Sequence, residues 1–400
     1  MSEVVLNDIC ELIVDCPHST AYDEGSGYPL VRTPNIGRGR LIYSGMHRVC
    51  EEVYNKRNAR AIPQTNDLIF AREATAGNVA LIREGEKVCL GQRTVLIRPN
   101  ANLVNPAFLT YHLLAPEQQY KLLSTANGAT VAHVNMPTIR NLKLSLPPLA
   151  TQHRIATILS RYDSLIENYQ KQIKLLEEAA QRLYKEWFVD LHFPGHENTK
   201  IVDGVPEGWE KKKISDVCET VGGGTPSTKV PAYYKGGRIK WVTPTDITRN
   251  NCICLLDTDK KITEEGLRNS STKMVPAGTI LMTSRASVGY FGIADFEVCT
   301  NQGFISCIPI PNMQMYLLFN LMSRVDEIRQ KAGGSTYLEI SKSVFRNFDI
   351  VCPSEIILLQ FQDKASLVLK KEKTLSLQLR LLTEARDRLL PKLMSGEITV

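Results

Sequence analysis

The stretch TQHRIATILSRYDSLIENYQKQIKLLEEAAQRLYKEWFV, residues 151–189, carries apolar or aromatic side chains at steps that alternate between four and three residues. This alternation is typical of the narrow seam of a coiled coil rather than of a generic amphipathic helix. We therefore predict a long helix over residues 148–190, and such a helix needs a partner along its seam. The seam positions are Ile155, Leu159, Tyr162, Ile166, Tyr169, Ile173, Leu176, Ala180, Leu183 and Trp187.

A second seam lies 206 residues further along and predicts a second long helix over residues 353–400. Glu372 and Arg386 interrupt it, which leaves three options open: each pairs with neighbours of the other, each contacts a partner subunit, or the register shifts there. Each helix could pack separately on its own domain, but a seam this narrow favours mutual, antiparallel pairing. The second seam comprises Phe361, Ala365, Val368, Glu372, Leu375, Leu379, Leu382, Arg386, Leu389 and Leu393.

Both seams belong to an internal repeat, because the second half of the chain restates the first in the same order. Residues 6–36 parallel residues 214–247. Further on, FAREATAG parallels TSRASVG, and this comparison pairs Arg72 with Arg285. The repeat indicates that the chain consists of two copies of one structural plan.

The repeat predicts an α+β fold in which the halves are related by a pseudo-twofold axis. Residues 1–147 and 211–352 combine short apolar strands with glycine and proline turns, so we expect a mixed α/β domain in each. The helices of residues 148–190 and 353–400 follow these domains and form an antiparallel coiled coil. Residues 191–210 contain two prolines and three glycines and form the linker into the second half.

The composition places the chain among ordinary globular proteins, with 43% hydrophobic and 22% charged residues in 400. Glu3 and Asp8 lie where a secretory signal needs a basic start and an apolar core, and no apolar run approaches the length of a membrane span. We expect a cytoplasmic protein without membrane contact. The ten cysteines include no CxxC pair, which favours reduced thiols over a metal site.

No catalytic constellation stands out in the sequence. The glycine run of residues 222–224 is followed by Thr225-Pro226 without the lysine of a phosphate-binding loop. Asn105-Pro106-Ala107-Phe108 approaches the NPPF tetrapeptide of adenine methyltransferases but lacks the second proline, and a helix start explains it better. His192 and His196 flank a proline and a glycine that would break a metal-binding helix. We predict neither catalytic nor metal-ligating residues.

Nucleic-acid binding requires fewer specific residues than catalysis does, namely basic and amide side chains on a rigid framework. Residues 32–60 hold seven basic and two acidic residues, and residues 229–285 hold ten basic and five acidic ones. A solvated charged face is the alternative for either patch, but its recurrence in both copies favours a DNA contact. For Arg72 and Arg285 a framework arginine bonded to backbone is an equal alternative. The candidate DNA-binding residues are Arg38, Arg40, Arg72, Lys240, Arg249 and Arg285.

These features together resemble the DNA-specificity subunit of type I restriction–modification systems. The resemblance rests on GGGTPS, TPTDI and NQGF in the second half, on NPAFLTYHLL and EEAAQRLYKEWF in the first, and on the terminal LLPKLMSGEI. It covers essentially the whole chain. No single string decides it, but their doubled order is highly specific.

The resemblance implies a non-catalytic subunit in which each mixed domain is a target-recognition domain for one half of a split, asymmetric site in double-stranded DNA. The paired helices would set the spacing and dock two methyltransferase subunits, to which nuclease/translocase subunits can be added. No cofactor is expected in this chain, since S-adenosylmethionine, ATP and Mg²⁺ would belong to those partners.

The length of the predicted helix agrees with a split site. At 1.5 Å per residue, residues 151–189 extend about 58 Å, so domains at opposite ends of the pair cannot read one short continuous site. Half-sites one to one and a half duplex turns apart, at roughly 34–36 Å per turn, would fit. Two other hypotheses stay open: a methyltransferase with its own recognition region, and a coiled-coil scaffold without DNA affinity.

Overall fold

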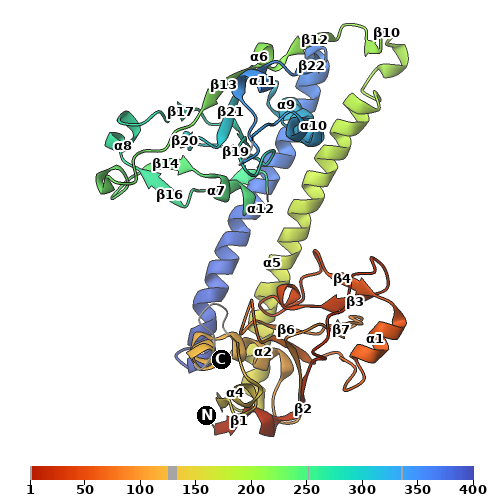
Figure 1. Cartoon of the computed structure of the whole chain (residues 1–400), viewed down its shortest axis with the longest axis vertical. Coiled ribbons are helices and arrows are strands. Elements are labelled where there is room, and N and C mark those ends of the chain that lie inside the picture. The colour runs from red at the N-terminus through yellow and green to blue at the C-terminus, as the bar shows by residue number, and fades with distance from the viewer. Residues whose placement is uncertain (1, 125–132, 251, 335–336) are drawn as a thin grey trace. The chain divides into compact units, whose positions relative to one another are not determined.

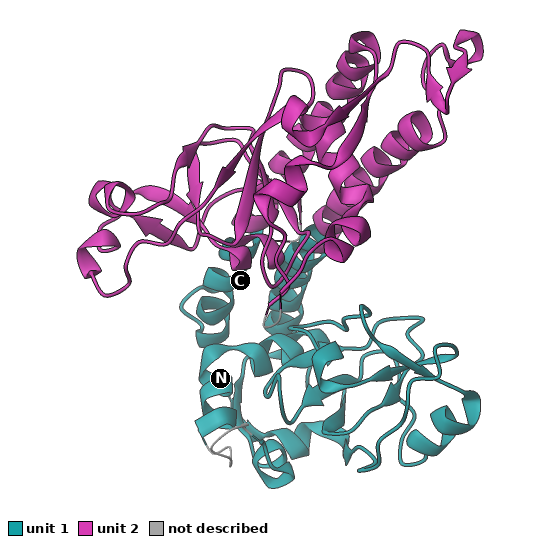
Figure 2. Cartoon of the chain, turned by 45° about the horizontal axis from the view of Figure 1, so that its top comes forward, with its two compact units in different colours: residues 1–166, 382–400 teal, residues 167–381 magenta. Residues whose placement is uncertain are grey.

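The computed structural model describes residues 2–124, 133–250, 252–334 and 337–400 (Figure 1). The chain divides into two compact units, which Figure 2 colours separately. Unit 1 consists of residues 1–166 and 382–400, and unit 2 of residues 167–381. Two long helices, α5 (Leu149–Tyr184) and α12 (Glu355–Ser395), contribute to both units. Each unit therefore combines one globular part with a portion of each helix.

The two long helices match the seams in the sequence. Helix α5 begins one residue after the predicted start and continues through a π-helical turn, η3 (Lys185–Val189), which confirms the first long helix. Helix α12 begins at Glu355 and ends at Ser395, inside the predicted range of residues 353–400. Each of the twenty seam positions is buried or half-buried.

Unit 1 is built around an antiparallel sheet with the strand order β2-β8-β5-β6. A second sheet has the order β4-β3-β7, and β1 pairs with β9. The strands are β1 (Ser2–Val5), β2 (Cys10–Asp15), β3 (Tyr28–Val31), β4 (His47–Val49), β5 (Leu68–Ala71), β6 (Val79–Leu81), β7 (Cys89–Leu90), β8 (Thr94–Pro99) and β9 (Lys143–Leu146). The helices and turns are η1 (Leu6–Ile9), η2 (Thr33–Asn35), α1 (Glu51–Arg57), α2 (Pro106–Leu114), α3 (Pro116–Ser124) and α4 (Met136–Arg140).

Unit 2 has a five-stranded sheet of order β13-β21-β18-β19-β15 and a four-stranded sheet of order β16-β14-β20-β17. Two further pairs are β12–β22 and β10–β11. The strands are β10 (Ile201–Val202), β11 (Val205–Pro206), β12 (Glu210–Lys213), β13 (Cys218–Gly222), β14 (Ile239–Val242), β15 (Cys254–Leu255), β16 (Lys260–Ile262), β17 (Met274–Val275), β18 (Ile280–Thr283), β19 (Phe291–Ala294), β20 (Val298–Thr300), β21 (Phe304–Pro309) and β22 (Asp349–Cys352). The helices and turns are η4 (His196–Asn198), α6 (Ile214–Val217), η5 (Pro231–Tyr233), α7 (Pro244–Thr248), α8 (Glu264–Arg268), α9 (Gln314–Ser323), α10 (Val325–Gln330) and α11 (Lys342–Arg346).

The strand orders confirm the internal repeat. The order β2-β8-β5-β6 of unit 1 recurs as β13-β21-β18-β19 in unit 2. The parallel pair β3–β7 recurs as β14–β20, and the antiparallel pair β1–β9 recurs as β12–β22. Two copies of one mixed α/β plan, each followed by a long helix, make up the chain.

The register of the repeat at its central hairpin follows from the strand pairing. Leu68 pairs with Leu81 across β5 and β6, and Ile280 pairs with Ile293 across β18 and β19. Both members of the second pair lie 212 residues after their counterparts in the first. The sequence comparison instead placed the two arginines of this region 213 residues apart.

The predicted pairing of Arg72 with Arg285 is therefore wrong by one residue. Arg72 corresponds to Ser284, and Glu73 corresponds to Arg285. The copies differ in length by one residue just before this hairpin. An alignment that matches the two identical arginines therefore misses the change of offset from 213 to 212. A slip of one residue in an extended chain turns a side chain to the opposite face, so the two arginines cannot share a role.

Each unit has its own core, which includes both long helices. In unit 1, Ile155 and Leu159 of α5 belong to the same hydrophobic cluster as Leu393 of α12. In unit 2, the ring of Phe361 in α12 lies 6.0 Å from the Trp187 ring that follows α5. Early residues of α5 thus meet late residues of α12, and late residues meet early ones. The helices are antiparallel in both units.

Candidate nucleic-acid interface

Arg72 lies inside unit 1 and is only 8% exposed. Its Nε donates to the Val134 carbonyl at 3.0 Å, and its Nη1 donates to Asp15 Oδ2 at 2.8 Å. Its Nη2 lies 2.8 Å from His133 Nε2, which must accept because a guanidinium only donates. The ring proton of His133 is then on Nδ1, 2.6 Å from Glu73 Oε1. These bonds make Arg72 a framework residue rather than a surface contact.

Arg285 has a different environment in unit 2. Its side chain is 45% exposed, and its Nε lies 3.5 Å from Glu339 Oε2. Two backbone contacts hold the chain around it in place. Arg285 forms an isolated antiparallel bridge with Glu339, and the N–H of Ala286 donates to the carbonyl of Leu338. A weakly paired guanidinium on a fixed backbone can still engage a phosphate.

Arg38 and Arg40 flank Gly39 in a turn that is fixed to β6. Gly39 has a φ of 96°, and its N–H donates to the Val79 carbonyl at 2.7 Å. The Arg38 side chain is exposed, and its Nη2 donates to the carbonyl of Leu114 at the end of α2. Arg40 is half-buried. This turn places one cation at the surface and one beside it.

Lys240 and Arg249, both in unit 2, differ in whether their side chains already contact other groups of the protein. Lys240 Nζ lies 3.3 Å from the centroid of the Phe296 ring and 3.6 Å from Asp257 Oδ1. Arg249 follows α7, is exposed, and forms no side-chain bond with any residue that the structure describes. Among the predicted DNA contacts, Arg249 therefore has the guanidinium most available to a ligand.

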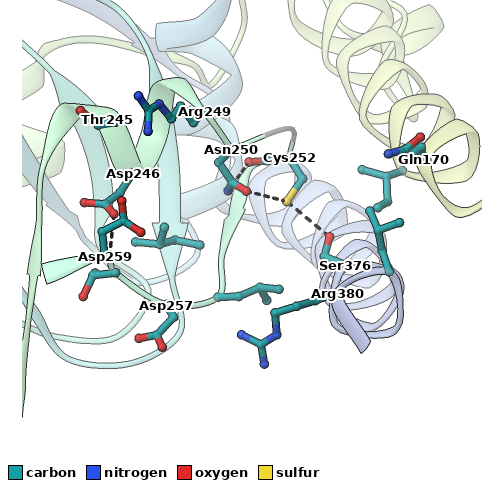
Figure 3. A pocket seen from close by; sticks show the side chains of 15 residues that line it. Gln170, Thr245, Asp246, Arg249, Asn250, Cys252, Asp257, Asp259, Ser376 and Arg380 are labelled. Carbon is teal, nitrogen blue, oxygen red and sulfur yellow. Dashed lines mark hydrogen bonds between the residues drawn. The ribbon is translucent and has the colours of Figure 1, made fainter. Parts of the chain in front are cut away.

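Arg249 borders a recess of about 580 Å³ in unit 2 (Figure 3). Asp246, which lines the same recess, accepts from Thr243 N–H and Oγ1 at 2.7 Å each, as the third helical residue of a capping box that Thr243 begins at the start of α7. Arg380 of α12 is a further exposed cation in this lining, and sequence reasoning missed it. The seam predicts that Leu379 is buried, but it does not predict that Arg380, the next residue, lines a recess.

The two basic patches are not equivalent. In unit 1, Arg57 is 5% exposed and donates to the carbonyls of Leu90 and Ser19, so its charge stabilises the fold. In unit 2, every basic residue from 229 to 285 except the half-buried Lys240 is exposed. The second patch therefore presents more charge to solvent than the first.

Glu372 and Arg386, which interrupt the second seam, both find partners. In unit 1, Arg386 Nη1 lies 2.8 Å from Asp163 Oδ1, and the Tyr111 hydroxyl donates to Asp163 Oδ2 at 2.5 Å. Burial and the adjacent carboxylate raise the pKa of Tyr111. In unit 2, Glu372 accepts from the backbone N–H of Cys254 at 2.9 Å. Each residue thus binds polar groups of its own unit, and neither of these contacts involves a neighbour of the other residue.

Other motifs have structural roles. Asn105 Oδ1 caps α2 by accepting from Phe108 N–H at 2.9 Å, which explains the NPAF string without methyltransferase chemistry. Within the described ranges no group of three or more histidine, cysteine, aspartate or glutamate side chains could hold a metal ion. In the same ranges no helix combines the length and apolarity needed to cross a membrane.

The fold matches a solved protein of this architecture. The crystal structure of the type-I restriction-modification system S subunit from M. genitalium aligns with a TM-score of 0.63 at 16% identity, covering 98% of this chain and 95% of that one. The chain also matches, over residues 1–178 and 206–366, the family described as type I restriction modification DNA specificity domain. It belongs to this family.

Curated relatives support the same assignment. The chain is 26% identical over 369 residues to the type I restriction enzyme HindI specificity subunit of Haemophilus influenzae, covering 76% of this chain and 80% of that protein. It is 27% identical over 361 residues to the putative MjaX specificity subunit of Methanocaldococcus jannaschii, covering 87% and 82%. Specificity subunits are the non-catalytic members of type I systems, and catalysis resides in their partner subunits.

Proposed function

We propose that each unit reads one half of a bipartite, asymmetric site in double-stranded DNA. The observation that carries this proposal is a framework repeated with different side chains at equivalent positions. The strand orders coincide, yet the exposed Arg285 of unit 2 stands where unit 1 has Glu73. A conserved framework with divergent side chains suits two related domains that recognise different base sequences.

The exposed cations and the loops that differ between the copies have separate roles in DNA binding. Arg38 in unit 1 and Arg249 and Arg285 in unit 2 have side chains in solvent, where they can neutralise phosphates. Such contacts give salt-dependent affinity and carry little sequence information. Base recognition then falls to side chains on the loops that differ between the two copies, acting in the major groove.

The long helices would set the distance between half-sites and dock two methyltransferase subunits, which nuclease/translocase subunits can join. Apolar side chains outside the seam support a docking role, because Leu175 is 62% exposed on α5, and Ile356 and Leu367 are 70% and 65% exposed on α12. S-adenosylmethionine, ATP and Mg²⁺ would be bound by those partners and not by this chain.

Co-expression with the cognate methyltransferase, followed by methylome sequencing, tests the proposal. We expect one modified motif with two specified halves and an unspecified spacer. Equivalent insertions in α5 and α12 should lengthen the spacer and leave both halves unchanged. A continuous motif, or an insertion that alters a half-site at constant spacer, would contradict the proposal.

A further inference from the structure

Two glutamates in unit 2, one from each long helix, meet at the segment that leads into β15. Glu177 of α5 accepts from the backbone N–H of Ile253 at 2.8 Å. Glu372 of α12 accepts from the next N–H, that of Cys254, at 2.9 Å. Consecutive amides of the globular part are thus held by carboxyl groups from both helices.

The two carboxyl groups lie beside each other in a buried place, because they accept from consecutive amides of one segment. Glu372 is 1% exposed and Glu177 is half-buried. Two ionised carboxylates side by side out of water repel each other, and one proton held between them removes this repulsion and lets one donate to the other. Removal from water and the neighbouring carboxylate raise the pKa of Glu372 to about 7.

No cation in the described ranges offsets the charge of the Glu177–Glu372 pair. Among the described residues, neither glutamate forms an ion pair with a lysine, arginine or histidine side chain. Lys373, beside Glu372, is paired with Asp295 of the globular part. The other titratable groups that face the pair are the thiols of Cys252 and Cys254, and burial raises the pKa of both. Both thiols therefore stay neutral near pH 7, and the charges of Lys373 and Asp295 offset each other, so a proton on the pair is what relieves its repulsion.

We propose that Glu177 and Glu372 are positioning residues that share one proton and thereby clamp the recognition domain of unit 2 to both long helices. When the proton leaves, two anions remain in contact in a buried place, and at least one backbone bond is released. Cys252 and Ser376, which bond to each other at 3.3 Å, line the adjacent recess, so water can reach the segment once it loosens (Figure 3). The hold on this domain then weakens toward alkaline pH.

This clamp has no counterpart at the equivalent positions of the first copy. The 206-residue offset of the seams places Ile166 at the position that corresponds to Glu372 and Thr383 at the position that corresponds to Glu177. Unit 1 therefore has no acid pair and serves as an internal reference. The consequence for affinity at the second half-site rests on the proposed function, whereas the clamp itself does not depend on DNA.

Amide hydrogen exchange on the full chain without DNA tests the clamp. Protection of Ile253 and Cys254, corrected for intrinsic exchange rates, should fall roughly tenfold per pH unit between about pH 5 and about pH 7 and level off above. The variant Glu372→Gln should retain protection at all pH values, because an amide keeps the acceptor for Cys254 N–H and donates permanently to Glu177. Amides of unit 1 should show no such slope.

The control is Glu178→Gln, the same substitution at the adjacent residue of α5, which makes only surface contacts at 3.8 Å to Lys174 and Arg182. It should preserve the wild-type profile. A flat wild-type profile, or a Glu372→Gln profile as steep as the wild type, would overturn the proposal. If the glutamine variant fails to fold, infrared titration of the wild type decides, since absence of a protonated carboxyl at about pH 6 also overturns it. Because no measurement involves DNA, failure here leaves the proposed function untouched, and the methylome result leaves the clamp untouched.

Discussion

The two units share a strand order but fasten their globular parts to the long helices with different chemistry. In unit 1 the globular part does this through Tyr111 of α2, which donates to Asp163 of α5, and Arg386 of α12 binds the same carboxylate at 2.8 Å. In unit 2 two acids, Glu177 and Glu372, bind consecutive backbone amides. The repeat thus conserves the backbone framework while the polar contacts diverge, so we expect the units to respond differently to pH and to mutation.

The hairpins after β5 and β18 show the same divergence. Arg72 is buried and satisfied within unit 1, whereas its counterpart Ser284 is a small buried residue. Arg285, one position further on, is exposed and corresponds to Glu73. Residues of one type therefore have opposite roles in two copies of one hairpin. Burial and register, and not residue identity, decide the role.

The largest expected effect is the loss of stability on replacing Arg72. Arg72→Ala leaves the Asp15 carboxylate, His133 and the Val134 carbonyl without their donor, so unit 1 should lose about 3–5 kcal/mol. Urea unfolding followed by hydrogen exchange in each unit measures this. Arg285→Ala should unfold like the wild type and weaken only DNA binding. If Arg72→Ala kept wild-type stability and lost DNA affinity instead, the assignment of a structural role to Arg72 and a DNA-binding role to Arg285 would be wrong.

A smaller effect, about 1–3 kcal/mol, is expected from pH in unit 2 alone. Burial raises the folded-state pKa of Glu372 above its ordinary value of 4.5 to about 7, so the folded state keeps a proton that the unfolded state releases. The stability of unit 2 is then greatest at about pH 4.5 and below, and declines as the pH rises to about 7. Unfolding of unit 2 monitored against pH should show this decline in the wild type but not in Glu372→Gln. An equal decline in unit 1 would remove the distinction between the units.

The sequence predicted what depends on periodicity. The four-three steps predicted both long helices to within a few residues, because seam burial requires that spacing whatever the partner. Glu177 lies in the run EEAAQ and looks like a solvated acid, since nothing local shows that Ile253 will donate to it from 76 residues away. Likewise the sequence places Arg57 in a basic patch, whereas in the structure its guanidinium donates to backbone carbonyls of the fold. Contacts between distant segments are set by tertiary structure, which a single sequence does not display.

A third experiment probes the anchor of unit 1 and should cost about 1–2 kcal/mol. Asp163→Ala removes the acceptor shared by Arg386 and Tyr111, both of which are partly or wholly buried. Urea unfolding at constant pH measures the loss. The matched control is Asp387→Ala, because Asp387 also binds Arg386, at 2.8 Å, but is 60% exposed, so little change is expected. Equal losses from both substitutions would show that Arg386 needs any carboxylate and that burial of the anchor is irrelevant.

The smallest effect separates two cations within unit 2 and concerns DNA affinity only. Arg249 is exposed and unpaired among the described residues, whereas Lys240 already faces Phe296 and Asp257. If Arg249 binds a phosphate, Arg249→Ala should weaken binding a few-fold for all sequences and lower the slope of log affinity against log salt by about one. Lys240→Ala should leave that slope unchanged, since its charge is engaged within the fold. Fluorescence anisotropy at several salt concentrations measures both slopes. Equal slopes for wild type and Arg249→Ala would place the phosphate contacts elsewhere on the basic patch of unit 2, because an unpaired cation at a DNA interface must release a counterion.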